Sequence, residues 1–189
     1  MFRLIIGLVG PIASGKGEAA KFFQDAGFVY LSLSDRVREE AKNRGLALER
    51  ETLQNIGDNL RKEFGKDVLA KKTAAMINNE ETRNIVIDSI RNPGEINFLK
   101  DKLDIFIIGI TASRETRLEW YLKRNRDSDP KKAEDFYKVD SRDLGSGQEV
   151  HGQQVEACLE MSDLIIENNG RIEDLRKKLE EILKKFRIK

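Results

Sequence analysis

The ten residues Leu8-Val9-Gly10-Pro11-Ile12-Ala13-Ser14-Gly15-Lys16-Gly17 lead from an apolar stretch through a glycine-bounded loop into a helical pattern. Glycines allow successive backbone N–H groups to point inward at an anion, and a helix N-terminus adds about half a positive charge. A lysine at the position of Lys16 reaches the β- and γ-phosphates of a nucleoside triphosphate. The spacing G-x-x-x-x-G-K after a first buried strand therefore predicts a phosphate-binding loop.

This loop departs from its usual form at Gly17, where a Ser or Thr hydroxyl commonly ligates magnesium. Glu18 follows, so the sequence leaves open how a metal would be held there. The residues that we expect to contact the phosphates of ATP are Gly10, Ile12, Ala13, Ser14, Gly15, Lys16, Gly17 and Glu18.

Outward from the loop, short apolar runs alternate with helical periodicity, which is typical of a parallel sheet covered by helices. Runs that are continuous and rich in Ile, Val and Leu predict strands that are buried on both faces. The sequence therefore predicts an α/β protein with three α/β/α layers around a five-stranded parallel sheet. Its expected strands are Leu4–Val9, Phe28–Leu33, Ile85–Asp88, Ile105–Ile110 and Leu164–Ile166.

Helical patterns occupy much of the remaining chain. Three of them, over about 34–45, 53–64 and 67–77, form an insertion of about 34–80 that is too long for a simple crossover. The segment of about 125–147 is sharply polar, and we expect a mobile, partly helical lid over an open cleft. The other expected helices cover 16–26, begin at Pro93, cover 113–124 and cover 172–186.

Length and composition limit the possible functions. The 189 residues suffice for one well-cored domain over 1–189 and are few for two. The 34 basic and 33 acidic side chains nearly cancel, so we expect no broad nucleic-acid surface. The single cysteine, Cys158, excludes an internal disulfide. No signal-peptide pattern and no apolar run near ~20 residues is present, so we expect a cytoplasmic protein that contacts no membrane.

Four segments beyond the loop carry a resemblance to a known family. Ser34 to Arg38 is similar to an S/T-x-D-x-x-R region that receives an acceptor nucleotide, and Arg50 to Gly65 resembles the R-x-x-L-Q-x-x-G-x-x-x-R-x-x-x-G segment of viral-type deoxynucleotide kinases. Asp88 to Glu95 is similar to their D-x-x-R-x-x-x-E motif, and Ala157 to Gly170 resembles the A-D-x-V-I-x-N-x-G end of dephospho-CoA kinases. Over nearly its whole length the chain thus resembles P-loop NTPases of the nucleoside and deoxynucleoside monophosphate kinase family, and also dephospho-CoA kinases and adenylate-kinase-related proteins.

The resemblance implies transfer of the γ-phosphate of ATP, with Mg²⁺, to a nucleoside or deoxynucleoside monophosphate. It implies catalytic roles for Lys16, Asp88, Arg91, Arg124 and Arg126, with Asp88 holding the metal directly or through water. It implies acceptor contacts at Asp35, Arg38, Gln54, Arg61, Arg91 and Glu95, and adenine-side contacts at Asn168, Asn169 and Gly170.

Arginines flank the polar segment of about 125–147, and one or two of them would close on the transferring phosphate. Arg124 and Arg126 are the preferred lid residues, with Arg142 in reserve, whereas solvated positions are the simpler interpretation for most of the others. We assign no chemical role to His151 or to Cys158.

Two alternatives remain open from the sequence. One is a dephospho-CoA kinase-like enzyme that phosphorylates a ribose hydroxyl, for which Asp35 could be the base. The other is a regulatory module that binds a nucleoside triphosphate without transferring phosphate, because Gly17-Glu18 replaces the usual hydroxyl. Both a monomer and a homodimer are compatible with the sequence.

Overall fold

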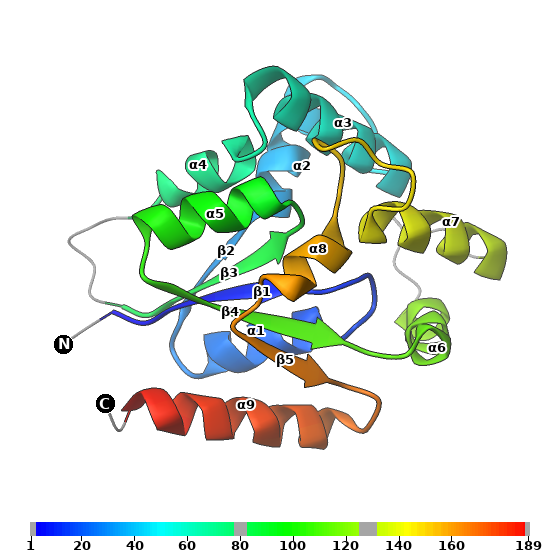
Figure 1. The fold of residues 1–189 in the computed structure, drawn as a ribbon. Helices are drawn as coiled ribbons and strands as arrows, with labels where there is room; N and C mark the ends of the chain where they lie inside the picture. The colour runs from blue at the N-terminus through cyan, green and yellow to red at the C-terminus, as the bar shows by residue number, and fades with distance from the viewer. Residues whose placement is uncertain (1–2, 78–82, 125–131, 188–189) are drawn as a thin grey trace.

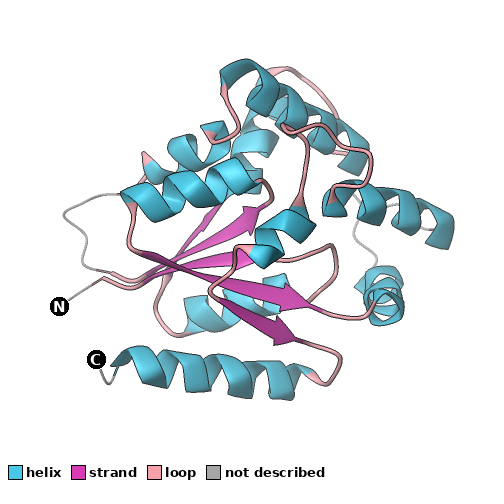
Figure 2. Ribbon diagram, in the orientation of Figure 1, coloured by secondary structure: helices cyan, strands magenta, loops and turns pink. Residues whose placement is uncertain are grey.

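A computed structural model describes residues 3–77, 83–124 and 132–187 of the chain. Five parallel strands form one sheet in the order β2-β3-β1-β4-β5, as Figure 2 shows. All five expected strands are present, and the parallel α/β fold class is confirmed. Their bounds are β1 (Ile5–Val9), β2 (Val29–Ser32), β3 (Ile85–Ile90), β4 (Ile105–Thr111) and β5 (Leu164–Glu167).

Helices cover both faces of the sheet, which gives the expected three layers (Figure 1). On one face, α1 (Lys16–Asp25) and α9 (Ile172–Arg187) contribute Phe23 and Leu179 to one apolar cluster. On the other face, α5 (Pro93–Lys102) and α8 (Val155–Glu160) contribute Leu99 and Cys158 to a second cluster. The strands are apolar because both faces of the sheet are packed in this way.

Three helices follow β2 and precede β3. They are α2 (Leu33–Asn43), α3 (Arg50–Phe64) and α4 (Val68–Ala74), and they form the helices expected for the insertion. The last of them ends three residues before the expected end at Ile77.

Two more helices, α6 (Arg114–Arg124) and α7 (Ala133–Leu144), lie at the end of the sheet toward which the strands point (Figure 1). The expected lid segment is helical over α7, and this helix buries Phe136, Asp140 and Asp143. Residues 125–131, which include Arg126, lie outside the described residues. This polar segment therefore includes a helix that buries two of its acidic side chains, Asp140 and Asp143.

The strand β3 extends two residues beyond its expected end at Asp88. The pairing of β1 with β3 shifts register between Gly7 and Val9, and Ser89 adopts a left-handed φ of 66°. A non-glycine residue in this region is uncommon and marks local strain. Asp88 is thereby held at an irregular point of a central strand, one residue before the strained position.

Among the described residues, no helix is both long enough and apolar enough to cross a membrane.

Candidate active site at the carboxyl ends of the strands

A cavity of about 550 Å³ opens beside the loop that follows β1. Its wall is formed by loop residues 12–18, by side chains of α2 and α3, by the end of β3, and by Trp120 and Arg124 of α6. The carboxyl ends of parallel strands are where open α/β sheets bind ligands. The cavity therefore joins the predicted phosphate loop to the helical insertion.

Close approaches of the backbone shape the loop. Gly10 has a φ of 152°, and a Cβ there would lie 2.1 Å from the carbonyl oxygen of Ile110. Gly15 has a φ of 100°, and its Cβ would lie 2.3 Å from Nδ2 of Asn168. Between them, Ala13 takes a left-handed φ of 61°. Side chains at the two glycines would collide with fixed groups, so the loop shape needs glycine at both places.

Lys16 begins α1 at the floor of this loop. Its Nζ donates hydrogen bonds to the carbonyl oxygens of Gly10 and Pro11, at 2.5 and 2.8 Å. Burial, together with the charge of the nearby Arg91, lowers the pKa of Lys16 to about 8. An anion that entered the cavity would offset both causes and restore the full charge.

The loop is supported from behind by two residues far away in the sequence. Nδ2 of Asn168 donates to the carbonyl oxygen of Ser14 at 3.0 Å. Nη1 of Arg117 donates to the carbonyl oxygen of Ile12 at 3.2 Å, and its Nε donates to that of Ala112 at 3.2 Å. Both supporting side chains are almost completely buried. They hold the loop by the carbonyl groups of Ile12 and Ser14, so these bonds use none of its backbone N–H groups.

Asn168, which was predicted to contact the adenine, lies elsewhere in the structure. This side chain lies behind the loop and does not line the cavity. Asn169 accepts a hydrogen bond from the backbone N–H of Ser113 at 2.7 Å, and a Cβ at Gly170 would lie 3.0 Å from Oδ2 of Asp174. Asn168 therefore supports the phosphate loop, and an adenine contact at Asn169 or Gly170 stays a prediction.

Asp88 faces the cavity with Lys16 and is only 9% exposed. Its Oδ1 accepts a hydrogen bond from the backbone N–H of Ser89 at 2.6 Å, and its Oδ2 accepts from the hydroxyl of Tyr30 at 3.3 Å. Burial and the charge of Asp88 raise the pKa of Tyr30 to about 12. Tyr30 therefore remains a neutral donor that orients a carboxylate suited to a hard cation.

Three of the predicted acceptor arginines line the cavity from three different elements. Arg38 of α2 donates to Oγ of Ser34 at 2.6 Å and to Oδ1 of Asp35 at 3.2 Å. Arg61 of α3 is buried, and its Nε donates to Oε1 of Glu95 at 2.8 Å. Arg91, just after β3, forms an ion pair with the buried Asp143 of α7.

Glu95 itself lies behind this wall and has no exposed surface. Besides accepting from Arg61, its carboxylate accepts from the backbone N–H groups of Arg91 and Asn92, at 2.8 and 3.0 Å. The second of these bonds completes the capping box of α5. The expected direct contact between Glu95 and an acceptor does not fit this position, because every bond of Glu95 supports Arg61 or the start of α5.

The arginines of α6, just before the expected lid, have different surroundings. Arg124 lines the cavity, with its guanidinium carbon 4.9 Å from the centroid of the Tyr121 ring. Arg117 is buried and forms an ion pair with Asp140, whose Oδ2 also accepts from Nε of Arg114 at 3.0 Å. The solvated position expected for most of these arginines is therefore wrong for Arg117.

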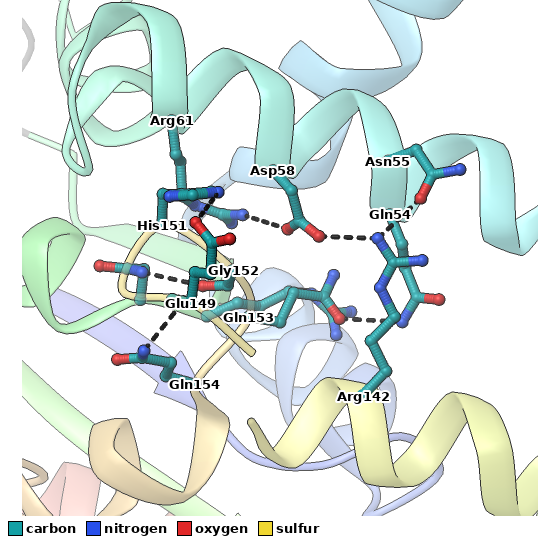
Figure 3. A network of polar contacts seen from close by, with 12 residues as sticks. Gln54, Asn55, Asp58, Arg61, Arg142, Glu149, His151, Gly152, Gln153 and Gln154 are labelled. Atoms are coloured by element: carbon teal, nitrogen blue, oxygen red, sulfur yellow. Dashed lines mark hydrogen bonds and ion pairs between the residues drawn. The ribbon is translucent and has the colours of Figure 1, made fainter. Parts of the chain in front are cut away.

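Arg142 connects α7 to α3. Its Nη2 donates to Oδ1 of Asn55 and to Oδ2 of Asp58, both at 2.7 Å, as Figure 3 shows. Together with Asp140 and Asp143, it ties α7 to the phosphate loop through Arg117, to the end of β3 through Arg91, and to the insertion. Helix α7 is thus linked both to the phosphate loop side of the cavity and to the insertion.

Gln153 and Trp120 both line the cavity, although the sequence analysis gave neither residue a role in the site. Gln153 lies in a polar loop with no motif around it, so no local signal could have identified it. Trp120 has a weak signal, since it follows Arg117 on α6 by three residues and shares part of its face.

Comparisons with known proteins agree with this geometry. Residues 9–137 match a family model described as an AAA domain. A shikimate kinase from Bacteroides thetaiotaomicron superposes with a TM-score of 0.62 at 13% identity, covering 96% of this chain and 98% of that chain. A putative kinase from Chloroflexus aurantiacus gives 0.59 at 13% identity, covering 97% of each chain. The fold and the loop therefore define a P-loop kinase-like protein.

Similarity in sequence places the chain more narrowly. It is 30% identical to a UPF0200 protein from Methanothermobacter thermautotrophicus, over 98% of this chain and 92% of that one. It is also 30% identical to the UPF0200 protein of Pyrococcus horikoshii, over 97% of both. The chain belongs to the UPF0200 family.

Proposed function

We propose that this protein transfers the γ-phosphate of ATP to a nucleoside or deoxynucleoside monophosphate. The observation that carries the proposal is a single cavity that begins at the phosphate loop and whose wall includes Arg38, Arg61 and Arg91. A monophosphate is already anionic, so it needs no base, but cations must bring it close to a second anion. Arginine suits this task because its planar guanidinium binds phosphate through two parallel hydrogen bonds.

The donor would bind with its phosphates on the amides at the start of α1. Lys16 would exchange its bonds to the carbonyls of Gly10 and Pro11 for bonds to the phosphate oxygens. Charge on the transferring group would then be neutralised by Lys16, with Arg91 and Arg124 nearby on the same wall. The other cavity wall, built by α2 and α3, would hold the acceptor.

The site offers magnesium a carboxylate, that of Asp88. Mg²⁺ usually binds through one or two carboxylates plus substrate phosphates and keeps several waters. Asp88 offers such a carboxylate, whereas the described residues hold no cluster of three or more His, Cys, Asp or Glu side chains suited to a metal. Asp88 would hold the ion directly or through water, with the phosphates of ATP providing the remaining ligands and Mg²⁺ polarising the phosphoryl oxygens.

A hydroxyl acceptor is the second candidate, because Asp35 also lines the cavity. Solved structures of similar fold include shikimate kinases, among them one in complex with shikimate. A hydroxyl needs a carboxylate base within hydrogen-bond reach. Asp35 is held by Arg38 at 3.2 Å, an arrangement that fits a charge partner better than a free base.

The proposal is tested by a coupled ADP-release screen with all ribo- and deoxyribonucleoside monophosphates, dephospho-CoA and shikimate as acceptors. We expect turnover with a monophosphate and a loss of several orders of magnitude in Lys16→Ala, which keeps its fold. No acceptor above the ATPase background would indicate a module that only binds nucleotide.

Arg91→Ala and Asp35→Asn separate the two acceptor classes. For a monophosphate, Arg91→Ala should raise the KM of the acceptor and lower kcat with little change in ATP affinity, and Asp35→Asn should be milder. An indispensable Asp35 together with dispensable Arg38 and Arg91 would favour the hydroxyl acceptor and reject the monophosphate.

A further inference from the structure

Two glutamines from distant parts of the chain meet in the wall of the cavity. Nε2 of Gln54, on α3, donates to Oε1 of Gln153 at 3.0 Å, across 99 residues of sequence. Figure 3 shows this pair between α3 and the loop that leads to α8. Both side chains are nearly buried, and both line the cavity. Buried amides are costly unless they are hydrogen-bonded, so a pair that is only half bonded needs an explanation.

Each amide keeps one atom without a partner. Within the described ranges, Oε1 of Gln54 and Nε2 of Gln153 make no further protein contact, and neither atom is sealed from solvent. One is an acceptor and the other is a donor. If both amides rotate by half a turn, donor and acceptor exchange places but their number is the same. The pair therefore always offers one donor and one acceptor side by side.

The loop around Gln153 is fixed on both sides. Nδ2 of the buried Asn92 donates to the carbonyl oxygen of Gly152 at 2.9 Å and to that of Val150 at 3.0 Å. The backbone N–H of Gln154 donates to the carbonyl oxygen of Arg91 at 2.7 Å. Gln153 is thus pre-organised at the cavity wall, which lowers the entropy cost of binding a ligand there.

The surroundings of the pair suit a flat, largely apolar ring. Leu33, Val37, Leu53 and Leu69 line the same cavity. Small-molecule sites commonly combine apolar walls with a few polar groups that fix orientation. A donor and an acceptor next to each other match the edge of a nucleobase, where an N–H and a ring nitrogen or carbonyl oxygen are adjacent.

We propose that Gln54 and Gln153 together bind the edge of the acceptor's nucleobase. This inference rests on the proposed monophosphate acceptor. It extends that proposal to the base, because the amide pair has no use for an acceptor without a ring edge. A joint rotation of the two amides lets the wild-type protein take bases with either order of donor and acceptor.

Replacing one of the two glutamines with glutamate would prevent this joint rotation. In Gln153→Glu, the carboxylate still accepts from Nε2 of Gln54, so Oε1 of Gln54 must face the ligand as an acceptor. The second carboxylate oxygen is also an acceptor, so the site then presents two acceptors. Guanine alone among the common bases carries two adjacent donors, its ring N1–H and its 2-amino group. Gln54→Glu has the same consequence by the mirror argument.

The test is calorimetric binding of AMP, CMP, GMP, UMP and ribose 5-phosphate to the full chain, without ATP. Wild type should bind nucleotides at least about tenfold more tightly than ribose 5-phosphate. Gln153→Glu should shift the ratio of affinities toward GMP by about tenfold or more. The matched control is Gln154→Glu, whose exposed side chain bonds to the carbonyl of Glu149 and lies outside the cavity lining. This control should leave the ratio unchanged.

Gln54→Glu serves as the second variant if Gln153→Glu does not fold. Equal binding of ribose 5-phosphate and nucleotides, or a glutamate variant that shifts all four nucleotides alike, would overturn the inference. Transfer to a monophosphate, combined with either of those two binding results, would keep the proposed function and reject the amide pair. Base-dependent binding that the glutamates redirect, with no transfer to any monophosphate, would keep the pair and reject the kinase activity.

Discussion

The buried ammonium of Lys16, for which we propose a phosphate-binding role, lowers the stability of the folded protein. Its ammonium is almost fully buried, and only the carbonyls of Gly10 and Pro11 are its hydrogen-bond acceptors among the described residues. Burial of a charge without a full counter-charge disfavours the protonated form, which explains a pKa lowered to about 8.

Lys16→Met should therefore change how stability depends on pH. Between about pH 8 and 10.5 the unfolded chain holds a proton on Lys16 that the folded chain has lost, so wild-type stability rises with pH there. The difference in unfolding free energy, wild type minus Lys16→Met, should rise by up to about 1.4 kcal/mol per pH unit in that window. Urea unfolding at pH 7, 8, 9 and 10 measures it. A difference that stays flat over the window would contradict the lowered pKa.

At the scale of elements, α3 lines the cavity and α7 pairs with residues around it. Arg50, Gln54, Gly57 and Arg61 recur at helical spacing, so one face of α3 lines the cavity. Helix α7 supplies the buried Asp140 and Asp143, which form ion pairs with Arg117 and Arg91 of neighbouring elements. Buried ion pairs add little net stability but are costly to break singly.

Variants of the Arg117–Asp140 pair should affect the free energy of unfolding and the ATP affinity differently. Arg117→Met leaves Asp140 buried with fewer partners and should cost about 3 kcal/mol or more. The double variant Arg117→Met/Asp140→Leu should regain most of that loss, because two matched apolar side chains replace the pair. ATP affinity should stay reduced in both, since the carbonyl of Ile12 has lost its donor.

Urea unfolding and calorimetric titration with ATP provide the two measurements for these variants. If the double variant bound ATP as tightly as wild type, Arg117 would have only a structural role.

At Gly57, a small side chain should raise stability, whereas a large one should weaken acceptor binding. A Cβ there would meet Nη1 of Arg61 at 3.5 Å and Cγ2 of Val37 at 3.7 Å, which are ordinary contacts. Gly57→Ala should raise stability by about 0.5–1 kcal/mol, because alanine is the better helix former. Gly57→Leu should instead weaken acceptor binding by filling the cavity.

Thermal unfolding compares these variants with Gly45→Ala. Gly45 has open space around it but a φ of 66°, so its alanine should destabilise. A loss of stability in Gly57→Ala would mean that α3 needs glycine there for its backbone.

At the scale of the whole molecule, one cavity runs from the phosphate loop to the helical insertion. The phosphate loop is held from behind by Asn168 and Arg117. Ligands that bind only the folded state stabilise it by mass action, by an amount that grows with the ratio of ligand concentration to Kd.

A bisubstrate analogue, two nucleosides joined through five phosphates, should therefore raise the Tm more than saturating ATP or a monophosphate alone. At 100 times its Kd such a ligand adds about 2.7 kcal/mol to the free energy of unfolding. Differential scanning fluorimetry measures the shift, with Lys16→Ala as the control that should lose most of it. Equal shifts for the analogue and for ATP would indicate that the insertion binds no nucleotide.

The strands, most of the helices and the phosphate loop could be predicted from the residues themselves, whereas Gln54 and Arg61 were placed in the site by the resemblance. The strands and the loop depend on residues close together in the chain: apolar runs for β1 and β4, and the glycine spacing before Lys16. Short-range periodicity and turn chemistry are local properties, so the chain states them directly.

Only the tertiary structure decided which polar groups meet. The bonds of Arg117 to Ile12, of Asn168 to Ser14 and of Gln54 to Gln153 span 105, 154 and 99 residues. A buried arginine and a solvated one look alike in a charged sequence, because burial depends on how distant elements pack and on the need to pair every buried polar group. For the same reason Glu95 supports the site from behind, although its spacing from Asp88 predicted a direct contact.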